Sequence, residues 1–111
     1  MPNIERGEVW LVDLGMAAKV RPAVVLSIPF LDNERAVYAI VPHTTGLRGG
    51  RFEVVIDVPW LEPGAFDVQG MRNLPRSVFM RRLGDLDPAQ IQKIAQTIRL
   101  WLGIGSTPLG M

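Results

Sequence analysis

The sequence contains no cysteine, which excludes disulfide bonds and thiolate chemistry and fits a reducing cytoplasm. Its single histidine, His43, excludes both a ribonuclease that works with a histidine pair and a metal site built from several histidines. No E-x-x-H spacing, phosphate-binding loop, dinucleotide glycine fingerprint or Gly-x-Ser-x-Gly motif occurs. We therefore expect no metal and no cofactor.

Long hydrophobic runs are also absent. None approaches the roughly 20 residues that a membrane helix needs, and the N-terminal segment MPNIERGEVW has charges of both signs and no signal-peptide core. We therefore expect a cytoplasmic protein without a membrane anchor. The chain has 111 residues, 48% of them hydrophobic and 21% charged, which fits one globular domain. We expect that domain to span residues 1–104, with a flexible tail at 105–111.

The net charge is only +1, but basic residues gather in one segment. Between Val68 and Gly84 every charged residue is an arginine: Arg72, Arg76, Arg81 and Arg82. Such a segment can face phosphates. The alternative is that these arginines are only solvent-exposed side chains of a strand and its loop.

The hydrophobic pattern predicts short strands followed by one helix. Pro22 is expected to begin its strand, because proline lacks the N–H that a strand interior uses. The strands are expected at 7–14, 22–28, 36–42 and 51–58, with weaker ones within 65–73 and 76–82. Short antiparallel strands of this number, with one terminal helix, predict a small, strongly bent sheet or partly open barrel.

The C-terminal helix has clear start and stop signals. Asp87 is a good N-cap, Pro88 suits the first helical position, and Gly103 is a natural stop. Between them one face is apolar at helical spacing: Ile91, Ile94, Ala95, Ile98 and Trp101 or Leu102. This helix is expected to pack on the sheet.

Arg21 stands directly before an apolar strand in the segment KVRPAVVLS, residues 19 to 27. An arginine there holds a guanidinium at the rim of an apolar core. From the local sequence alone, Arg21 either binds a ligand or forms a structural ion pair with an acid such as Asp13 or Glu8.

The segment VPHTTGLRGG, residues 41 to 50, follows a predicted strand end. The hydroxyls of Thr44 and Thr45 can bind a phosphate, and the glycines let a ligand approach the backbone, although threonine and glycine are also common in turns. His43 fits a structural role beside a strand end at least as well as a chemical one. Gln69 can read a base edge or be a simple surface amide.

Taken together, these segments resemble the MazF/PemK family of type II toxin–antitoxin ribonucleases. The resemblance rests on five pieces in the family's order and with about its spacing: RGEVWLVDL (6–14), RPAVVLS (21–27), VPHTT (41–45), RFEVVI (51–56) and RRLGDL (81–86). It implies an SH3-like β-barrel of the MazF/PemK/CcdB type with a C-terminal helix, acting as a homodimer. It further implies metal-independent cleavage of single-stranded RNA to 2′,3′-cyclic phosphate and 5′-hydroxyl ends, and neutralisation by a cognate antitoxin.

The resemblance also implies residue roles. Arg21 matches the family's main catalytic residue and Thr44 its first threonine after the second long strand. We expect Arg21 to stabilise the phosphorane and then to protonate the leaving 5′-oxygen, because its fork matches two phosphate oxygens. The candidate RNA-binding residues are Thr45, Arg48, Gln69 and Arg72. Gln69 matches the family's Asp-Gln segment only in part, since Asp67-Val68-Gln69 has an inserted residue.

A second departure from the family and two alternatives accompany this interpretation. The loop GMAAKV before Arg21 is shorter than in the best-known family members, so RNA coverage and cutting specificity are expected to differ. One alternative is a CcdB-like toxin, which poisons gyrase through the end of its helix. The other is a non-catalytic binding module on the same barrel.

Overall fold

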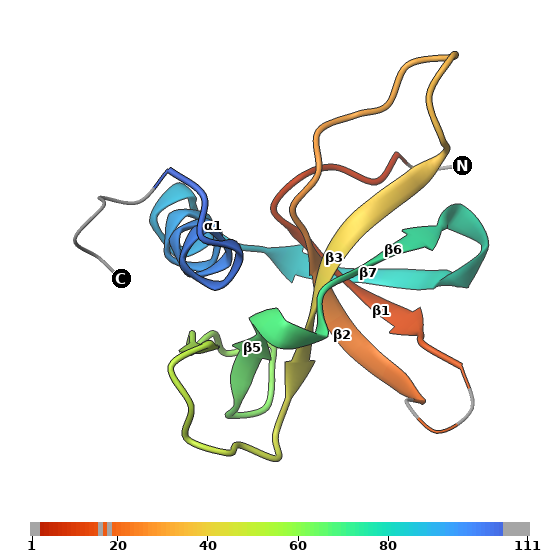
Figure 1. The fold of residues 1–111 in the computed structure, drawn as a ribbon. Coiled ribbons are helices and arrows are strands. Elements are labelled where there is room, and N and C mark those ends of the chain that lie inside the picture. The colour runs from red at the N-terminus through yellow and green to blue at the C-terminus, as the bar shows by residue number, and fades with distance from the viewer. Residues whose placement is uncertain (1–2, 16, 18, 106–111) are drawn as a thin grey trace.

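The computed structural model describes residues 3–15, 17 and 19–105 (Figure 1). No helix within these ranges is long and apolar enough to cross a membrane. Apart from Gly105, the tail expected at 105–111 lies outside the described residues. The strands are β1 (Glu8–Asp13), β2 (Val20–Val25), β3 (Val37–Thr44), β4 (Glu53–Val55), β5 (Ala65–Asp67), β6 (Arg72–Pro75) and β7 (Phe79–Asp85). Two 3₁₀ turns, η1 (Val68–Gly70) and η2 (Arg76–Val78), and the helix α1 (Pro88–Leu102) complete the fold.

The strands form one antiparallel sheet that divides at β3. Its order is β4-β5-β3-β2-β1-β7, and β6 also pairs with β3. The start of β3 pairs with β6, whereas its end pairs with β5, so the sheet bends around this long strand (Figure 1). Within the described residues the end strands β4 and β7 do not pair with each other. The mainly β fold with a C-terminal helix is thus confirmed, and its barrel is open.

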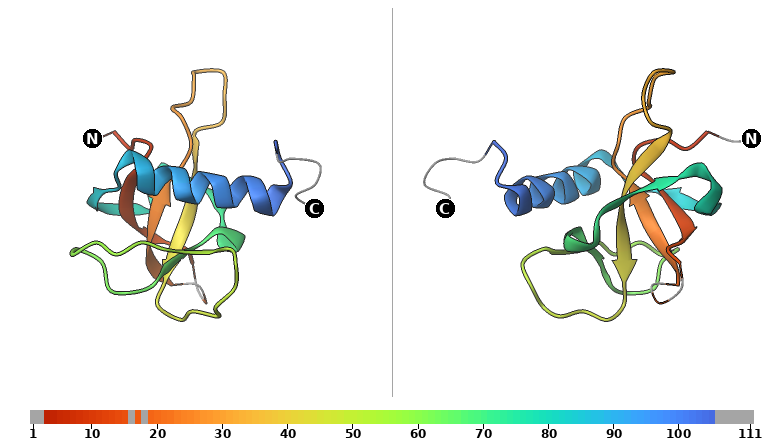
Figure 2. Two further views of the ribbon diagram at one scale, coloured as in Figure 1. Left: turned by 90° about the vertical axis from the view of Figure 1, so that its left-hand side faces the viewer. Right: turned by 45° about the vertical axis from the view of Figure 1, so that its right-hand side comes forward.

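The two faces of the sheet carry separate apolar cores. Helix α1 crosses one face (Figure 2) and adds the buried Ile94 to a core that also contains Val24, Val41 and Phe66. On the other face the curled sheet encloses a second core around Trp10 and Phe79, whose rings meet edge to face with centroids 5.9 Å apart. Because side chains alternate along a strand, neighbouring residues of β2 and β3 serve opposite cores.

Helix α1 begins and ends where the sequence predicts. Asp87 and Gln90 form a reciprocal capping box, and Pro88 is the first helical residue. Gly103 ends the helix in the left-handed conformation with a φ of 69°. Ile94 is fully buried and Ile91 and Ile98 pack beside it, so the expected apolar face is confirmed as far as Ile98. Its predicted end is wrong, because Trp101 and Leu102 are exposed.

Two strand predictions need correction. Pro22 is the third residue of β2 rather than its first. It is tolerated because pairing with β3 begins only at Ala23, so β2 has a partner on one side at Pro22. The strand expected at 51–58 pairs only over Glu53–Val55, because its partner β5 is equally short. Its alternating apolar residues Phe52, Val54, Ile56 and Val58 still pack into one core, as predicted.

Candidate active site

Arg21 and Thr44 lie at the ends of adjacent strands. Strands β2 and β3 run antiparallel with Ala23 opposite Pro42. This register, continued two residues along both strands, places Arg21 across from Thr44. Residues opposite each other in an antiparallel pair project from the same face of the sheet. The fold therefore brings the two predicted catalytic residues to one face, the face that also carries Ala23, Val25 and Ile40 of the second core. We call the part of this face that lies outside that core the open face.

Two acids considered as structural partners of Arg21 also make other contacts. The Glu8 carboxylate pairs with Arg82 at 3.3 Å and accepts a hydrogen bond from the Trp10 indole N–H. The Asp13 carboxylate accepts the backbone N–H of Gly15 at 2.9 Å. Arg21 itself is partly buried on β2, which suits a guanidinium held in one place at the rim of a core.

The Thr44 hydroxyl is oriented by the turn that follows it. Its Oγ1 accepts the backbone N–H of Gly46 at 3.1 Å, which leaves the hydroxyl proton available for a phosphate oxygen. The backbone beside Thr44 is tightly packed, because a Cβ on Gly64 would lie 2.2 Å from the Thr44 carbonyl oxygen. Only glycine fits at position 64, and its close approach supports the end of β3.

A hollow of about 200 Å³ lies beside Arg21 at the ends of β2 and β3. It is lined by Val20, Arg21, Pro22, His43, Thr45 and Glu62. Thr45, a predicted RNA contact, is exposed there. The structure thus brings Thr45 to the same end of the sheet as Arg21 and Thr44.

His43 belongs to the core on the α1 side. As the neighbour of Thr44 in β3, it projects from the opposite face. Its ring packs edge to face on Phe66, with centroids 5.1 Å apart, and it is only 3% exposed. Burial lowers the pKa of His43 and the charge of Glu62 partly opposes this effect, while its Nε2 has no hydrogen-bond partner among the described residues. These contacts favour the structural interpretation of His43.

Arg48 and Gln69 meet at a second hollow, of about 180 Å³. Its lining consists of Arg48, Gly50, Phe52, Glu53, Asp67 and Gln69. The Glu53 carboxylate accepts the backbone N–H groups of Arg48 and Gly49 at 2.9 and 2.8 Å, which pins the loop and lowers the pKa of Glu53. Gln69 lies on η1, whose cap Asp67 accepts the Gln69 N–H at 3.2 Å. Glu53 and Asp67 were missed at the sequence level, because only the tertiary pairing of β4 with β5 brings them opposite each other.

The arginines of the basic segment have different roles. Arg72 is exposed on β6 opposite Ile40, which places it on the open face about 13 Å along β3 from Thr44. Arg76 donates to the Phe79 carbonyl and lies 5.3 Å from the Trp10 ring centroid. Arg82 forms ion pairs with Glu8 and Asp85. Arg72 therefore lies on the open face, whereas Arg76 and Arg82 make contacts within the fold.

Residues of the type that bind metals do not gather in the part of the chain that the structure describes. No group of three or more His, Cys, Asp or Glu side chains there is arranged to hold a metal ion. The site consists instead of a guanidinium, hydroxyls and amides around an exposed strand end. Such groups can hold a phosphodiester in place and neutralise charge on it.

Comparison with known proteins gives a consistent answer. A family model described as "PemK-like, MazF-like toxin of type II toxin-antitoxin system" matches residues 5–102. A mycobacterial endoribonuclease solved with its cognate antitoxin is 23% identical, with a TM-score of 0.80 over 95% of this chain and 100% of that one. A MazE–MazF crystal structure from Deinococcus radiodurans is 20% identical, with a TM-score of 0.78 over 95% and 100%. The Mycobacterium tuberculosis toxin MazF-mt6 is 23% identical, with a TM-score of 0.76 over 89% and 99%. At these identities the likeness shows a shared fold, and it confirms the predicted fold type.

Proposed function

The chain belongs to the family of PemK-like, MazF-like toxins of type II toxin–antitoxin systems, and on that premise we propose that it is an endoribonuclease that cleaves single-stranded RNA without a metal ion. The observation that carries the proposal is the placement of Arg21 across from Thr44 on the open face, derived from the β2–β3 register. We propose the family's domain for residues 1–104, and the match over residues 5–102 supports it.

The proposed reaction uses the RNA's own 2′-hydroxyl as nucleophile. The 2′-oxygen loses its proton to solvent and attacks the adjacent phosphorus, and the bond to the 5′-oxygen breaks. The leaving 5′-oxygen takes a proton from Arg21, which regains one from solvent, and the products carry a 2′,3′-cyclic phosphate and a 5′-hydroxyl. The enzyme must hold sugar and phosphate in line and neutralise the extra negative charge of the phosphorane. No external nucleophile is needed.

Arg21 and Thr44 have distinct parts in this reaction. The Arg21 guanidinium contacts two phosphate oxygens, stabilises the phosphorane and then donates a proton to the leaving 5′-oxygen. The Thr44 hydroxyl, fixed by Gly46, orients the phosphate. His43 also lines the hollow beside Arg21, but its ring is buried and packs on Phe66, so the proposed mechanism assigns it no proton transfer.

The RNA is proposed to run along the open face. Thr45 contacts the phosphate next to the cleaved one, and Arg72 contacts a phosphate further along β3. Arg48 and Gln69, which share one hollow, contact a neighbouring nucleotide. Single bases outside a duplex can be read through their hydrogen-bonding edges, and amide and guanidinium groups suit that task.

The proposed partners follow from the family. We expect a homodimer and a cognate antitoxin that blocks the RNA-binding face, and we place the activity in the cytoplasm, where its RNA substrate is. Two structural relatives were solved with antitoxins, which supports the antitoxin part of the proposal.

Growth arrest on expression of the toxin tests the proposal and its rivals. Wild-type protein is expected to arrest growth and fragment cellular RNA, and Arg21→Ala is expected to do neither while remaining folded. The CcdB-like alternative acts through the helix end, where Trp101 and Leu102 are 43% and 51% exposed. Arrest that depends on this end and leaves RNA intact would support that alternative, and no arrest with intact RNA would support the binding module.

A further inference from the structure

The hollow that holds Arg48 and Gln69 lies close to Thr44. Ala65 of β5 is the strand partner of Thr44, and Asp67 stands two residues further along β5, so its side chain projects from the same face as that of Thr44. Diagonal neighbours of this kind on adjacent strands are about 7–8 Å apart. This separation is comparable with one nucleotide of an extended single strand, so a base next to the scissile phosphate can reach Asp67.

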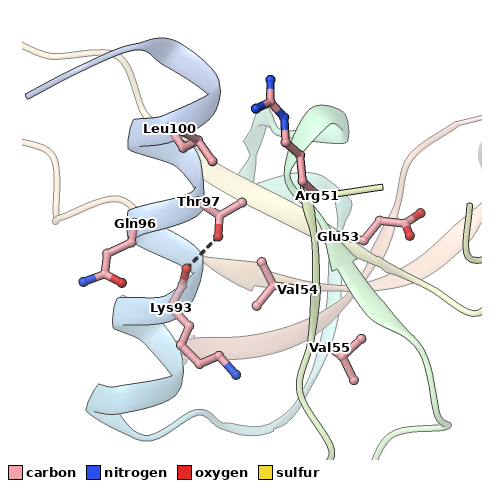
Figure 3. Close-up of a pocket in the computed structure, with 8 residues that line it drawn as sticks. All are labelled: Arg51, Glu53, Val54, Val55, Lys93, Gln96, Thr97 and Leu100. Carbon is pink, nitrogen blue, oxygen red and sulfur yellow. Dashed lines mark hydrogen bonds between the residues drawn. The ribbon is translucent and has the colours of Figure 1, made fainter. Parts of the chain in front are cut away.

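Two carboxylates, those of Glu53 and Asp67, line this hollow, which we call the Glu53–Asp67 hollow. The two residues are opposite each other in the pairing of β4 with β5. Figure 3 shows Glu53 pointing away from α1, whereas its neighbour Val54 points toward the helix. Because opposite residues of an antiparallel pair project from one face, Asp67 also points away from α1. The hollow therefore belongs to the face that carries Arg21 and Thr44.

The two carboxylates differ in what they already bind. Both oxygens of Glu53 hold the loop, since they accept the backbone N–H groups of Arg48 and Gly49 at 2.9 and 2.8 Å. In Asp67 one oxygen, Oδ1, accepts the Gln69 N–H at 3.2 Å. Its Oδ2 accepts no hydrogen bond and forms no ion pair within the residues that the structure describes. Each carboxylate oxygen has two lone pairs, so Asp67 keeps acceptor capacity for a ligand on both oxygens.

The size of the Glu53–Asp67 hollow suits a single base. Its volume of about 180 Å³ is below the roughly 300–1,000 Å³ of pockets that enclose drug-sized ligands. Arg48 brings a positive charge to the hollow: its backbone N–H and, further down, its charge lower the pKa of Glu53. The hollow thus combines a carboxylate that accepts hydrogen bonds with a guanidinium that donates them.

We propose that Asp67 gives the cleavage its sequence specificity by binding a guanine next to the scissile phosphate, an inference that rests on the proposed RNA cleavage. Guanine is the one RNA base whose Watson–Crick edge presents two adjacent donors, N1–H and N2–H, and these match the two oxygens of one carboxylate. The O6 and N7 atoms of guanine are acceptors for an arginine such as Arg48.

The other three bases oppose Asp67 with an acceptor. Adenine and cytosine place a ring nitrogen that accepts beside their amino group, and uracil has a carbonyl on each side of its N3–H. Each of them therefore directs an acceptor at an Asp67 oxygen, and this repulsion selects against them. Guanine alone satisfies both oxygens.

The first test uses the wild-type, full-length protein and a randomised single-stranded RNA, with the sequences around the cuts read out. Guanine is expected at one of the two positions that flank the cut. Replacing that guanosine by inosine, which lacks the N2 amino group, is expected to lower kcat/KM at least about tenfold, because a hydrogen bond to a charged group is lost. Cuts without a flanking guanine, or equal cleavage of the inosine RNA, would overturn this inference and leave the proposed function standing. Intact RNA from a folded protein would overturn both.

Asp67→Asn tests the residue itself. Asparagine keeps an oxygen to cap η1 but replaces the second oxygen by an amide donor. The preference is expected to move from guanine toward adenine and cytosine, which pair a donor with an acceptor, and guanosine and inosine RNAs are expected to be cut equally.

Asp57→Asn is the matched control, because it removes an exposed acid that does not line the hollow. It is expected to keep the wild-type preference. An unchanged guanine preference in Asp67→Asn would overturn the role of Asp67. If Asp67→Asn fails to fold, the comparison of guanosine with inosine in the wild type still decides.

Discussion

The hydroxyl of Thr44 accepts the backbone N–H of Gly46 at 3.1 Å. This bond fixes the rotation of the side chain and leaves one hydroxyl proton to donate. In the proposed reaction that proton meets a phosphate oxygen. The contact therefore connects the turn after β3 with the orientation of the scissile phosphate.

Thr44→Val removes the hydroxyl while keeping the shape of the side chain. We expect kcat/KM for RNA cleavage to fall by about 10–10²-fold, in proportion to one lost hydrogen bond to a charged group. Thr44→Ser is the matched control and is expected to stay within a few-fold of wild type. Equal loss in both variants would show that packing, rather than the hydroxyl, is what matters.

Arg21→Ala removes the group that stabilises the phosphorane. Loss of one such donor typically costs about 10²–10³-fold, and we expect at least that reduction in kcat/KM. Arg21→Lys keeps the charge but not the two-pronged contact, so an intermediate activity is expected. Arg35→Ala, an exposed residue in the turn before β3, is the control for loss of positive charge. Cleavage by a folded Arg21→Ala protein at near wild-type rates would refute the assignment.

His43 is predicted to make stability depend on pH. Burial lowers its pKa from 6.5 in the folded protein, with Glu62 opposing, so the unfolded chain binds more protons between the two pKa values. The contribution of His43 to the free energy of unfolding is therefore fully present above about pH 6.5, and it declines as the pH falls toward the lowered pKa. Urea unfolding at pH 7.5 and 5.5 measures this difference.

His43→Leu tests the same interpretation. The variant is expected to have a smaller pH dependence of unfolding than wild type and to retain RNA cleavage, because His43 faces the core. Loss of cleavage in a folded His43→Leu protein, together with loss of an acidic limb in the pH–rate profile, would instead assign His43 a proton transfer.

Gly64→Ala is predicted to destabilise the end of β3. The new Cβ would lie 2.2 Å from the Thr44 carbonyl and 2.8 Å from the His43 ring, so the backbone must shift. We expect the free energy of unfolding to fall by about 1–3 kcal/mol or more, as for an overpacked core site. Gly50→Ala, with nothing within 4 Å of its Cβ, is expected to change stability by less than about 0.5 kcal/mol. Thermal unfolding of the two variants makes the comparison.

Local signals predicted part of this structure well. The limits of α1 follow from Asp87, Pro88 and Gly103, and its buried face follows from the spacing of Ile91, Ile94 and Ile98. These features depend on residues close in sequence, which is why a single sequence is informative about them.

Features that depend on strand partners were not predictable. Pro22 lies inside β2 because β3 pairs only from Ala23 onward, and no local signal reports where a partner begins. Thr44 and His43 project from opposite faces of the sheet because β3 continues to Thr44. The predicted strand ended at residue 42 and so gave no orientation for either side chain. Glu53 and Asp67 share a hollow because β4 pairs with β5, a tertiary contact that residue spacing does not encode.

The most direct test of the central claim is to map the ends of RNA fragments. Purified protein is incubated with a long single-stranded RNA in the presence of EDTA, and the new ends are identified chemically. We predict discrete cuts with 5′-hydroxyl and 2′,3′-cyclic phosphate ends, absent with Arg21→Ala and blocked by a 2′-deoxy substitution at the cut site. Intact RNA from a folded protein, or cuts that survive the 2′-deoxy substitution, would contradict cleavage through the RNA's own 2′-hydroxyl.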